Sequence, residues 1–317
     1  HEILVTARKK DVAINLLDAY DIKYTTISEA KKGLLNLGIE LITRDLKLLK
    51  IARKFNPDIL IGLMNPSITH VAWLLNKKSI MFTDTEHEKL INFASFPFAS
   101  YICTPECYTK DLGKKQVRYN SYHELAYLHP NYFTPNPSVL EELGLSENDT
   151  FIIMRFVSWA ASHDVGHSGL TLEDKRRAVA EFEKYGRVFI TSESSLPPEF
   201  EKYRITVSTE KVHDLLYYAT LLYGESATMA SECAVLGTHA IFCDYAGRGY
   251  TDEEEKYDLV YNFKDETTMG KKALEKALEL LANPNLKEDG MKKRKVLLKD
   301  KIDVTKFAVD FVEMHYS

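Results

Sequence analysis

The sequence lacks several features that would assign it to a common class of protein. It has no run of 18 or more apolar residues, so it predicts no transmembrane helix. Its 46 Asp and Glu residues outnumber its 41 Lys and Arg residues, and this net charge of −5 argues against nucleic acid as the main partner. The spacing of its four cysteines matches no zinc pattern, so we expect reduced, buried thiols. No Asp-x-Asp metal box is apparent, and we expect no metal site.

The start of the chain is also unusual. The sequence begins at His1 without a methionine and enters an apolar strand at residues 2–6 at once. This position is typical of the second strand of an α/β unit. We therefore expect a first strand, loop and helix to be missing, together with any signal peptide.

The rest of the sequence alternates short β-branched runs with amphipathic helical runs, a pattern typical of parallel sheets with crossover helices. A stretch rich in Pro and Asn at residues 128–137 interrupts this alternation and is typical of a linker. We predict an α/β protein with two Rossmann-like domains that face each other across a cleft. The predicted domains span residues 1–146 and 147–300, and residues 301–317 form a helix that crosses back to the first domain.

The most informative segment leads from a strand at residues 220–223 through Gly224 into a helix that opens at Ser226. Free backbone amides and the helix dipole suit this turn to a phosphate or diphosphate. The hydroxyls of Ser226 and Thr228 add donors. Glu232, six residues after Ser226, is suited to accept hydrogen bonds from sugar hydroxyls. The ordinary alternative is that Ser226 is only a helix N-cap.

A second candidate is a charged run at the carboxyl end of a predicted strand at residues 79–82. Ligands of open α/β sheets bind at such ends. Like charges close together raise a carboxylate pKa toward the range useful for a general base. The alternative is an acidic first helical turn that complements the helix dipole. The candidate residues are Asp84, Glu86, His87 and Glu88.

A third candidate is the loop that follows the first strand of the second half. Arg155 can pair with a phosphate in fork geometry, and His163 can donate to the same group. Ser158 adds a hydroxyl to this predicted nucleotide site. Metal ligation by His163, Asp164 and His167 and a loop whose polar groups satisfy one another are the alternatives.

Residues 31–55 form a basic amphipathic segment with seven Lys and Arg residues against Glu40 and Asp45. Such a helix can lie on an anionic membrane surface. The alternative is that its apolar face packs on the sheet while its lysines are solvated.

At these residues the sequence resembles the GT-B superfamily of nucleotide-sugar enzymes. The run from Gly224 to Glu232 is similar to the Ser-Gly-Gly-x-x-x-Glu box of UDP-N-acetylglucosamine 2-epimerases and MurG-type transferases. The resemblance implies that Ser226, Ala227 and Thr228 hold the diphosphate and that Glu232 holds the ribose. Ala227 and Thr228 replace two glycines of that box.

The run from Glu88 to Asn92, followed by the strand ending Thr104-Pro-Glu106, is similar to another epimerase segment. This likeness places Glu88, with Glu86 close by, on the catalytic or acceptor side. The epimerase His-Arg-x-Glu-Asn loop has no match around Arg155.

Over the whole chain the sequence is similar to the domain-of-unknown-function family numbered 354. The likeness rests on the Asp84-Thr-Glu-His87, Tyr122-His-Glu-Leu-Ala-Tyr-Leu-His-Pro130, Ser162-His-Asp-Val-Gly166 and Lys301-Ile-Asp-Val-Thr-Lys306 runs.

These observations predict a glycosyltransferase of polysaccharide biosynthesis that uses a UDP-type sugar nucleotide as donor, with no further cofactor. Glu88, Glu86 or His87 deprotonates an acceptor hydroxyl, and Arg155, His163 and the helix terminus stabilise the departing diphosphate. We expect a glycan or lipid-linked acceptor and a cytoplasmic location, with peripheral contact at the inner membrane face. A UDP-sugar 2-epimerase and a non-catalytic sugar-nucleotide-binding protein are the alternatives.

Overall fold

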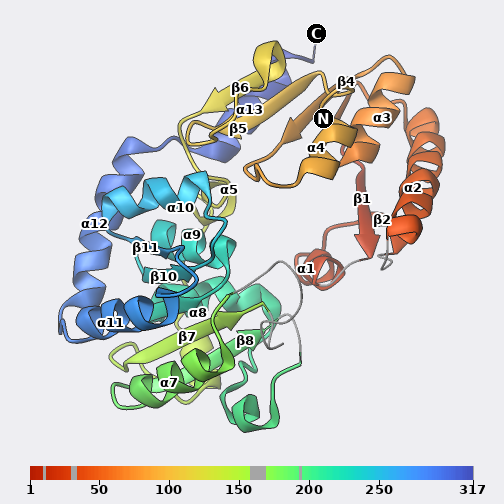
Figure 1. Cartoon of the computed structure of the whole chain (residues 1–317). Coiled ribbons are helices and arrows are strands. Elements are labelled where there is room, and N and C mark those ends of the chain that lie inside the picture. Colours follow the sequence, from red (N-terminus) through yellow and green to blue (C-terminus); the bar gives the residue numbers. More distant parts are fainter. Residues whose placement is uncertain (10–11, 30–33, 158–168, 193–194, 317) are drawn as a thin grey trace. The chain divides into compact units, whose positions relative to one another are not determined.

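The computed structural model describes residues 1–9, 12–29, 34–157, 169–192 and 195–316 (Figure 1). The chain forms two compact units, one of residues 1–119 with 306–317 and one of residues 120–305. The sequence placed the boundary after residue 146, whereas the structure divides the chain after Tyr119. Residues 120–146 belong to the second unit because they hydrogen-bond within it. The Ser121 hydroxyl, for example, donates to the Ile302 carbonyl at 2.7 Å.

The first unit contains two parallel sheets. Strands β1 (Val5–Lys9) and β2 (Tyr24–Glu29) pair with each other. A four-stranded sheet has the order β3-β4-β5-β6. Its strands are β3 (Ile59–Leu63), β4 (Lys78–Phe82), β5 (Tyr101–Pro105) and β6 (Gln116–Tyr119). The helical segments are α1 (Ala13–Ala19), α2 (Leu34–Phe55), α3 (Pro66–Leu74), α4 (Lys89–Ser95) and η1 (Gly113–Lys115).

Two apolar clusters complete this unit. Ile27 of β2 and Leu60 of β3 share one buried cluster with Leu48 of α2, so a common core joins the two sheets. The last helix, α13 (Val304–Met314), packs its aromatic side chains on the four-stranded sheet. Its Phe307 ring lies 5.1 Å from that of Tyr119, and its Phe311 ring lies 5.4 Å from that of Tyr101.

The second unit is built on one five-stranded parallel sheet with the order β11-β10-β9-β7-β8. The strands are β7 (Phe151–Phe156), β8 (Arg187–Ser192), β9 (Leu221–Gly224), β10 (His239–Cys243) and β11 (Val260–Phe263). The longer helices are α7 (Leu172–Phe182), α9 (Ala227–Leu236), α11 (Met269–Leu281) and α12 (Leu286–Asp300). The shorter ones are α5 (Leu125–Leu128), α6 (Ser138–Glu142), η2 (Pro198–Tyr203), η3 (Thr209–Lys211), α8 (Val212–Tyr218), α10 (Gly249–Glu254) and η4 (Glu255–Tyr257).

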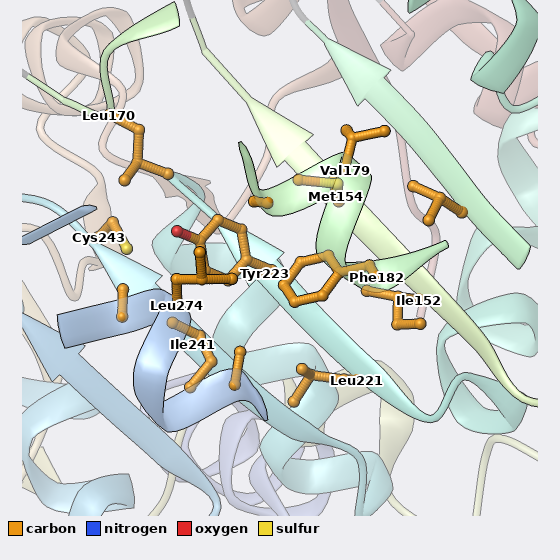
Figure 2. Packing of buried hydrophobic residues seen from close by; sticks show 14 of the residues in the cluster. Ile152, Met154, Leu170, Val179, Phe182, Leu221, Tyr223, Ile241, Cys243 and Leu274 are labelled. Atoms are coloured by element: carbon orange, nitrogen blue, oxygen red, sulfur yellow. The ribbon is translucent and has the colours of Figure 1, made fainter. Parts of the chain in front are cut away.

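The centre of this sheet is fully buried (Figure 2). The rings of Phe182 and Tyr223 meet edge to face at 5.2 Å, and both side chains are fully buried. Burial of a side chain as large as Phe182 contributes about 3 kcal/mol. Tyr223 lies on the central strand β9, so this core fixes the position of the turn that follows at Gly224.

Two predictions from composition can be compared with this fold. Cys103, Cys233 and Cys243 are free and buried, while Cys107 is partly exposed. Burial raises the pKa of the Cys103 thiol to about 12 and holds that thiol in its neutral form. Among the described residues no helix is both long enough and apolar enough to cross a bilayer.

Candidate functional site

The turn between β9 and α9 is closed by a direct backbone contact with β7. Gly224 has a φ of +155°, and a Cβ atom there would lie 2.0 Å from the carbonyl oxygen of Arg155. The next amide, that of Glu225, donates to this same carbonyl at 2.8 Å. Only glycine allows so close an approach of the two strands. The turn is therefore held rigidly at the carboxyl edge of the sheet.

Helix α9 begins directly after this turn. Ser226 is its N-cap, and the Ser226 hydroxyl accepts a hydrogen bond from the Met229 amide at 3.3 Å. The cap satisfies one of the first amides, while the amides of Ala227 and Thr228 have no acceptor within the helix. Ala227 is buried and Thr228 is exposed. The ordinary capping role of Ser226 is therefore present, and it is compatible with an anion at the other amides.

Glu232 is held by two side chains from other helices. The exposed fraction of Glu232 is 7%, and its Oε1 accepts from the Tyr127 hydroxyl at 3.0 Å. The Nε2 atom of His213 lies 2.9 Å from the same oxygen, within hydrogen-bond distance. The His213 ring also packs against the rings of Tyr127 and Phe133. The carboxylate is thus fixed in one orientation on the second turn of α9.

Sequence reasoning missed both partners of Glu232. Tyr127 is 105 positions and His213 is 19 positions away in the chain, on α5 and α8. A signal for Tyr127 was present in the run from Tyr122 to Pro130, but that run was not assigned a role. His213 had no signal of its own.

The third candidate loop is described only at its start. Arg155 lies near the end of β7, and its guanidinium donates to the Thr191 hydroxyl of β8 at 3.0 Å. Ser158 and His163 lie outside the described residues. The predicted contact of this loop with a phosphate therefore remains a prediction.

The charged run of the first unit lies in the connection between β4 and α4. Helix α4 begins at Lys89, with Glu88 as an N-cap whose side chain makes no capping bond. Asp84 and Glu86 therefore lie before the helix, and they do not form an acidic first turn. His87 and Glu88 are about half exposed, with 4.0 Å between the His87 Nε2 and the Glu88 Oε1.

The two acids that precede the helix bind other loop residues. Glu86 Oε1 accepts from the Thr109 amide at 3.1 Å, and Asp84 accepts from the Thr85 hydroxyl at 2.8 Å. Burial, together with the charges of Glu86 and Asp84, raises the pKa of the Tyr108 phenol to about 12. Both carboxylates therefore act on one buried, neutral hydroxyl. Among the residues described, no three His, Cys, Asp or Glu side chains are grouped to hold a metal ion.

Solved structures that are similar to this chain include UDP-GlcNAc 2-epimerases and glycosyltransferases. The chain is similar to a UDP-GlcNAc 2-epimerase from Neisseria meningitidis bound to UDP-GlcNAc, with 13% identity, a TM-score of 0.67 and coverage of 99% of this chain and 91% of that one. It is also similar to the S. aureus MnaA–UDP co-structure, with 10% identity and a TM-score of 0.63. This match covers 99% of this chain and 96% of that one. A third similar structure, the spinosyn forosaminyltransferase SpnP, is 9% identical to this chain with a TM-score of 0.59. The match covers 99% of this chain and 92% of that one.

These likenesses establish a fold of the GT-B and epimerase type, built from parallel α/β sheets. At such low identity they establish the fold alone. No curated protein matches the chain. The family described as "Protein of unknown function (DUF354)" matches residues 1–313, and the chain belongs to this family.

Proposed function

We propose that the second unit binds a UDP-type sugar nucleotide at the turn between β9 and α9. The observation that carries the proposal is the position of Glu232, a buried and oriented carboxylate on the same helix whose first amides have no acceptor within the helix. Six residues of helix separate Ser226 from Glu232, a rise of about 9 Å. A nucleoside diphosphate can bridge that separation, with its phosphates at the amides and its ribose at the carboxylate.

The contacts of Glu232 support the ribose assignment. Tyr127 and His213 both bind Oε1, and within the described residues Oε2 makes no hydrogen bond. A ribose hydroxyl can donate to Oε2 without displacing either partner. The fixed side chain also loses little rotamer freedom on binding, which favours affinity.

We further propose that the reaction is glycosyl transfer. Glu88, Glu86 or His87 takes the proton of the acceptor hydroxyl, whose oxygen attacks the anomeric carbon of the donor. The bond from that carbon to the diphosphate breaks, and UDP leaves. The α9 terminus, Arg155 and His163 stabilise the departing charge. No cofactor beyond the donor enters this scheme, and Asp84 completes the acidic group on the acceptor side.

A UDP-sugar 2-epimerase is the second candidate, favoured by the likeness to the N. meningitidis enzyme. It would use the same nucleotide site, but its base would remove a proton from the sugar of the bound nucleotide. Conversion of the sugar with no acceptor present distinguishes this reaction from transfer. Binding of nucleotide with neither reaction, unchanged in Glu88→Gln, would identify a binding protein.

The exposed face of α2 supports a lipid-linked acceptor reached from the cytoplasmic side of a membrane. Ile39, Ile42 and Leu46 are 59%, 62% and 63% exposed on this face. Lys50 and Arg53, one and two turns further along, are also exposed. Apolar side chains followed by basic ones fit an anionic bilayer surface. Sedimentation with vesicles of phosphatidylglycerol, compared with phosphatidylcholine vesicles, tests this contact, and a soluble glycan acceptor predicts no binding to either.

Calorimetry with UDP, UDP-GlcNAc and ADP tests the nucleotide site. We expect UDP species to bind, and Glu232→Ala to weaken them by about 1–3 kcal/mol because hydroxyl donors lose their acceptor. Glu279→Ala, which removes an exposed carboxylate of α11, is the control and leaves affinity unchanged. Equal affinity of the wild-type and Glu232→Ala proteins would contradict the ribose assignment.

A further inference from the structure

Glu225, the residue between Gly224 and the N-cap Ser226, binds two backbone segments at once. Its Oε2 accepts from the Val157 amide at 2.9 Å, and its Oε1 accepts from the Leu170 amide at 2.9 Å. Val157 directly follows β7, and Leu170 precedes α7. A single carboxylate therefore joins the end of one strand, the start of one helix and the turn that begins α9.

A buried lysine balances the charge of this carboxylate. The Nζ atom of Lys175 lies 3.0 Å from Glu225 Oε1, and the two side chains are only 3% and 8% exposed. The ammonium also lies 4.7 Å from the centre of the Phe156 ring. Removal of Lys175 would take this counter-charge away from the buried Glu225 carboxylate.

The surrounding glycines leave room for this arrangement. A Cβ atom at Gly169 would lie 2.5 Å from Glu225 Oε1, and a Cβ at Gly224 would meet the carbonyl of β7. The backbone on both sides of the carboxylate is thus compatible only with very small residues. The Leu170 amide donates a hydrogen bond to Glu225, and the Leu170 side chain belongs to the same core cluster as Tyr223 and Cys243 (Figure 2).

We propose that Glu225 and Lys175 form a positioning pair for the phosphate site: Glu225 fixes Val157 and Leu170 against the N-terminus of α9, and Lys175 cancels a negative charge that would otherwise repel a diphosphate. The second part rests on the proposed function, because it assumes a diphosphate at this terminus. The first part concerns the free protein. Neither residue touches the ligand in this proposal.

The pair has a specific signature in its dependence on charge. In Lys175→Met the aliphatic stem remains but the ammonium is lost, so the Glu225 carboxylate loses this counter-charge beside a bound diphosphate. Affinity of this variant should therefore fall, and removal of the Glu225 charge in the same protein should restore it. Burial keeps the Tyr223 phenol and the Cys243 thiol neutral, since it raises the pKa of each well above its usual value. The other charged groups around the pair are Asp174, Arg177 and Asp244.

The test measures binding of UDP-GlcNAc by calorimetry at pH 8. We expect Lys175→Met to lose about tenfold in affinity. Lys175→Met/Glu225→Gln, which removes both charges, should recover at least fivefold of this loss. The control is Arg176→Met, at the residue after Lys175 in α7, which breaks an exposed ion pair with Glu199 and changes affinity less than twofold. No loss in Lys175→Met, or no recovery in the double variant, would overturn the charge role.

Hydrogen exchange of the free protein tests the first part without nucleotide. The Val157 and Leu170 amides should exchange at least tenfold faster in Glu225→Ala than in the wild-type and Arg176→Met proteins. Unchanged exchange at both amides would overturn the positioning role. If the wild-type protein binds no UDP-GlcNAc, the proposed function fails while this measurement still decides the positioning role.

Discussion

His239 predicts a specific loss of stability in mild acid. It begins β10, and its side chain is 1% exposed. Burial, with a smaller contribution from Lys293 at 3.3 Å, lowers its pKa from 6.5 to about 4, although Asp289 at 3.5 Å opposes the shift. The folded protein therefore keeps the imidazole neutral at a pH where the unfolded chain takes up a proton.

The sign and size of the effect follow from this difference. The stabilisation is fully present above pH 6.5 and is lost as pH falls toward 4, because only the unfolded state binds the proton in that interval. A fall of the pKa from 6.5 to about 4 corresponds to about 3 kcal/mol in total. Between pH 7.5 and pH 5 the loss is about 2 kcal/mol.

Urea unfolding followed by circular dichroism measures this loss. The free energy of unfolding of the wild-type protein and of His239→Phe is compared at pH 7.5, 6 and 5. Other groups titrate in both proteins, so the difference between the two isolates His239. We expect the wild-type protein to lose about 2 kcal/mol more than His239→Phe between pH 7.5 and pH 5. Parallel pH profiles would refute the reasoning.

Three further predictions concern single side chains. Burial holds the pKa of Glu254 well above its usual value, so the free energy of unfolding falls as pH rises above about 4.5. Between pH 5 and pH 8 the urea midpoint of Glu254→Gln should therefore fall less than that of the wild-type protein. Gly224→Ala forces a methyl group onto the Arg155 carbonyl of β7 and should lower the free energy of unfolding in urea by at least about 2 kcal/mol. An unchanged urea midpoint would contradict the close approach of the two strands. Tyr127→Phe removes one donor to Glu232 and should weaken UDP binding about fivefold in calorimetry, and unchanged affinity would separate this contact from the nucleotide site.

Strong local signals made part of the candidate site predictable from the sequence. Gly224 after an apolar strand and Ser226 before a helical run predicted the turn and the start of the helix. The structure has the N-cap at Ser226 and a left-handed C-cap at Gly237 with a φ of +90°. Each of these features depends on residues within one turn of the chain.

Long-range contacts explain what the sequence did not predict. The Pro- and Asn-rich run at residues 128–137 was interpreted as a linker, and the structure assigns it to the second unit, together with the preceding helix α5 whose Leu125 and Leu128 are fully buried. Glu86 was interpreted as a candidate general base or, alternatively, as part of an acidic helical turn, and neither interpretation indicated the hydrogen bond that its carboxylate accepts from Thr109, 23 positions away. Glu225 and Lys175 showed no periodic pattern. Such pairings depend on how elements pack, which composition and spacing do not reveal.

The packing of α13 has a consequence for the order in which the protein folds during synthesis. The first unit takes Phe307 and Phe311 from the end of the chain to cover Tyr119 and Tyr101. The second unit is continuous from Asn120 to Thr305. Because the ribosome makes the chain from its N-terminus, the unit that is begun first is completed last. Until residues 306–317 have been made, these two aromatic side chains of the first unit lack their cover.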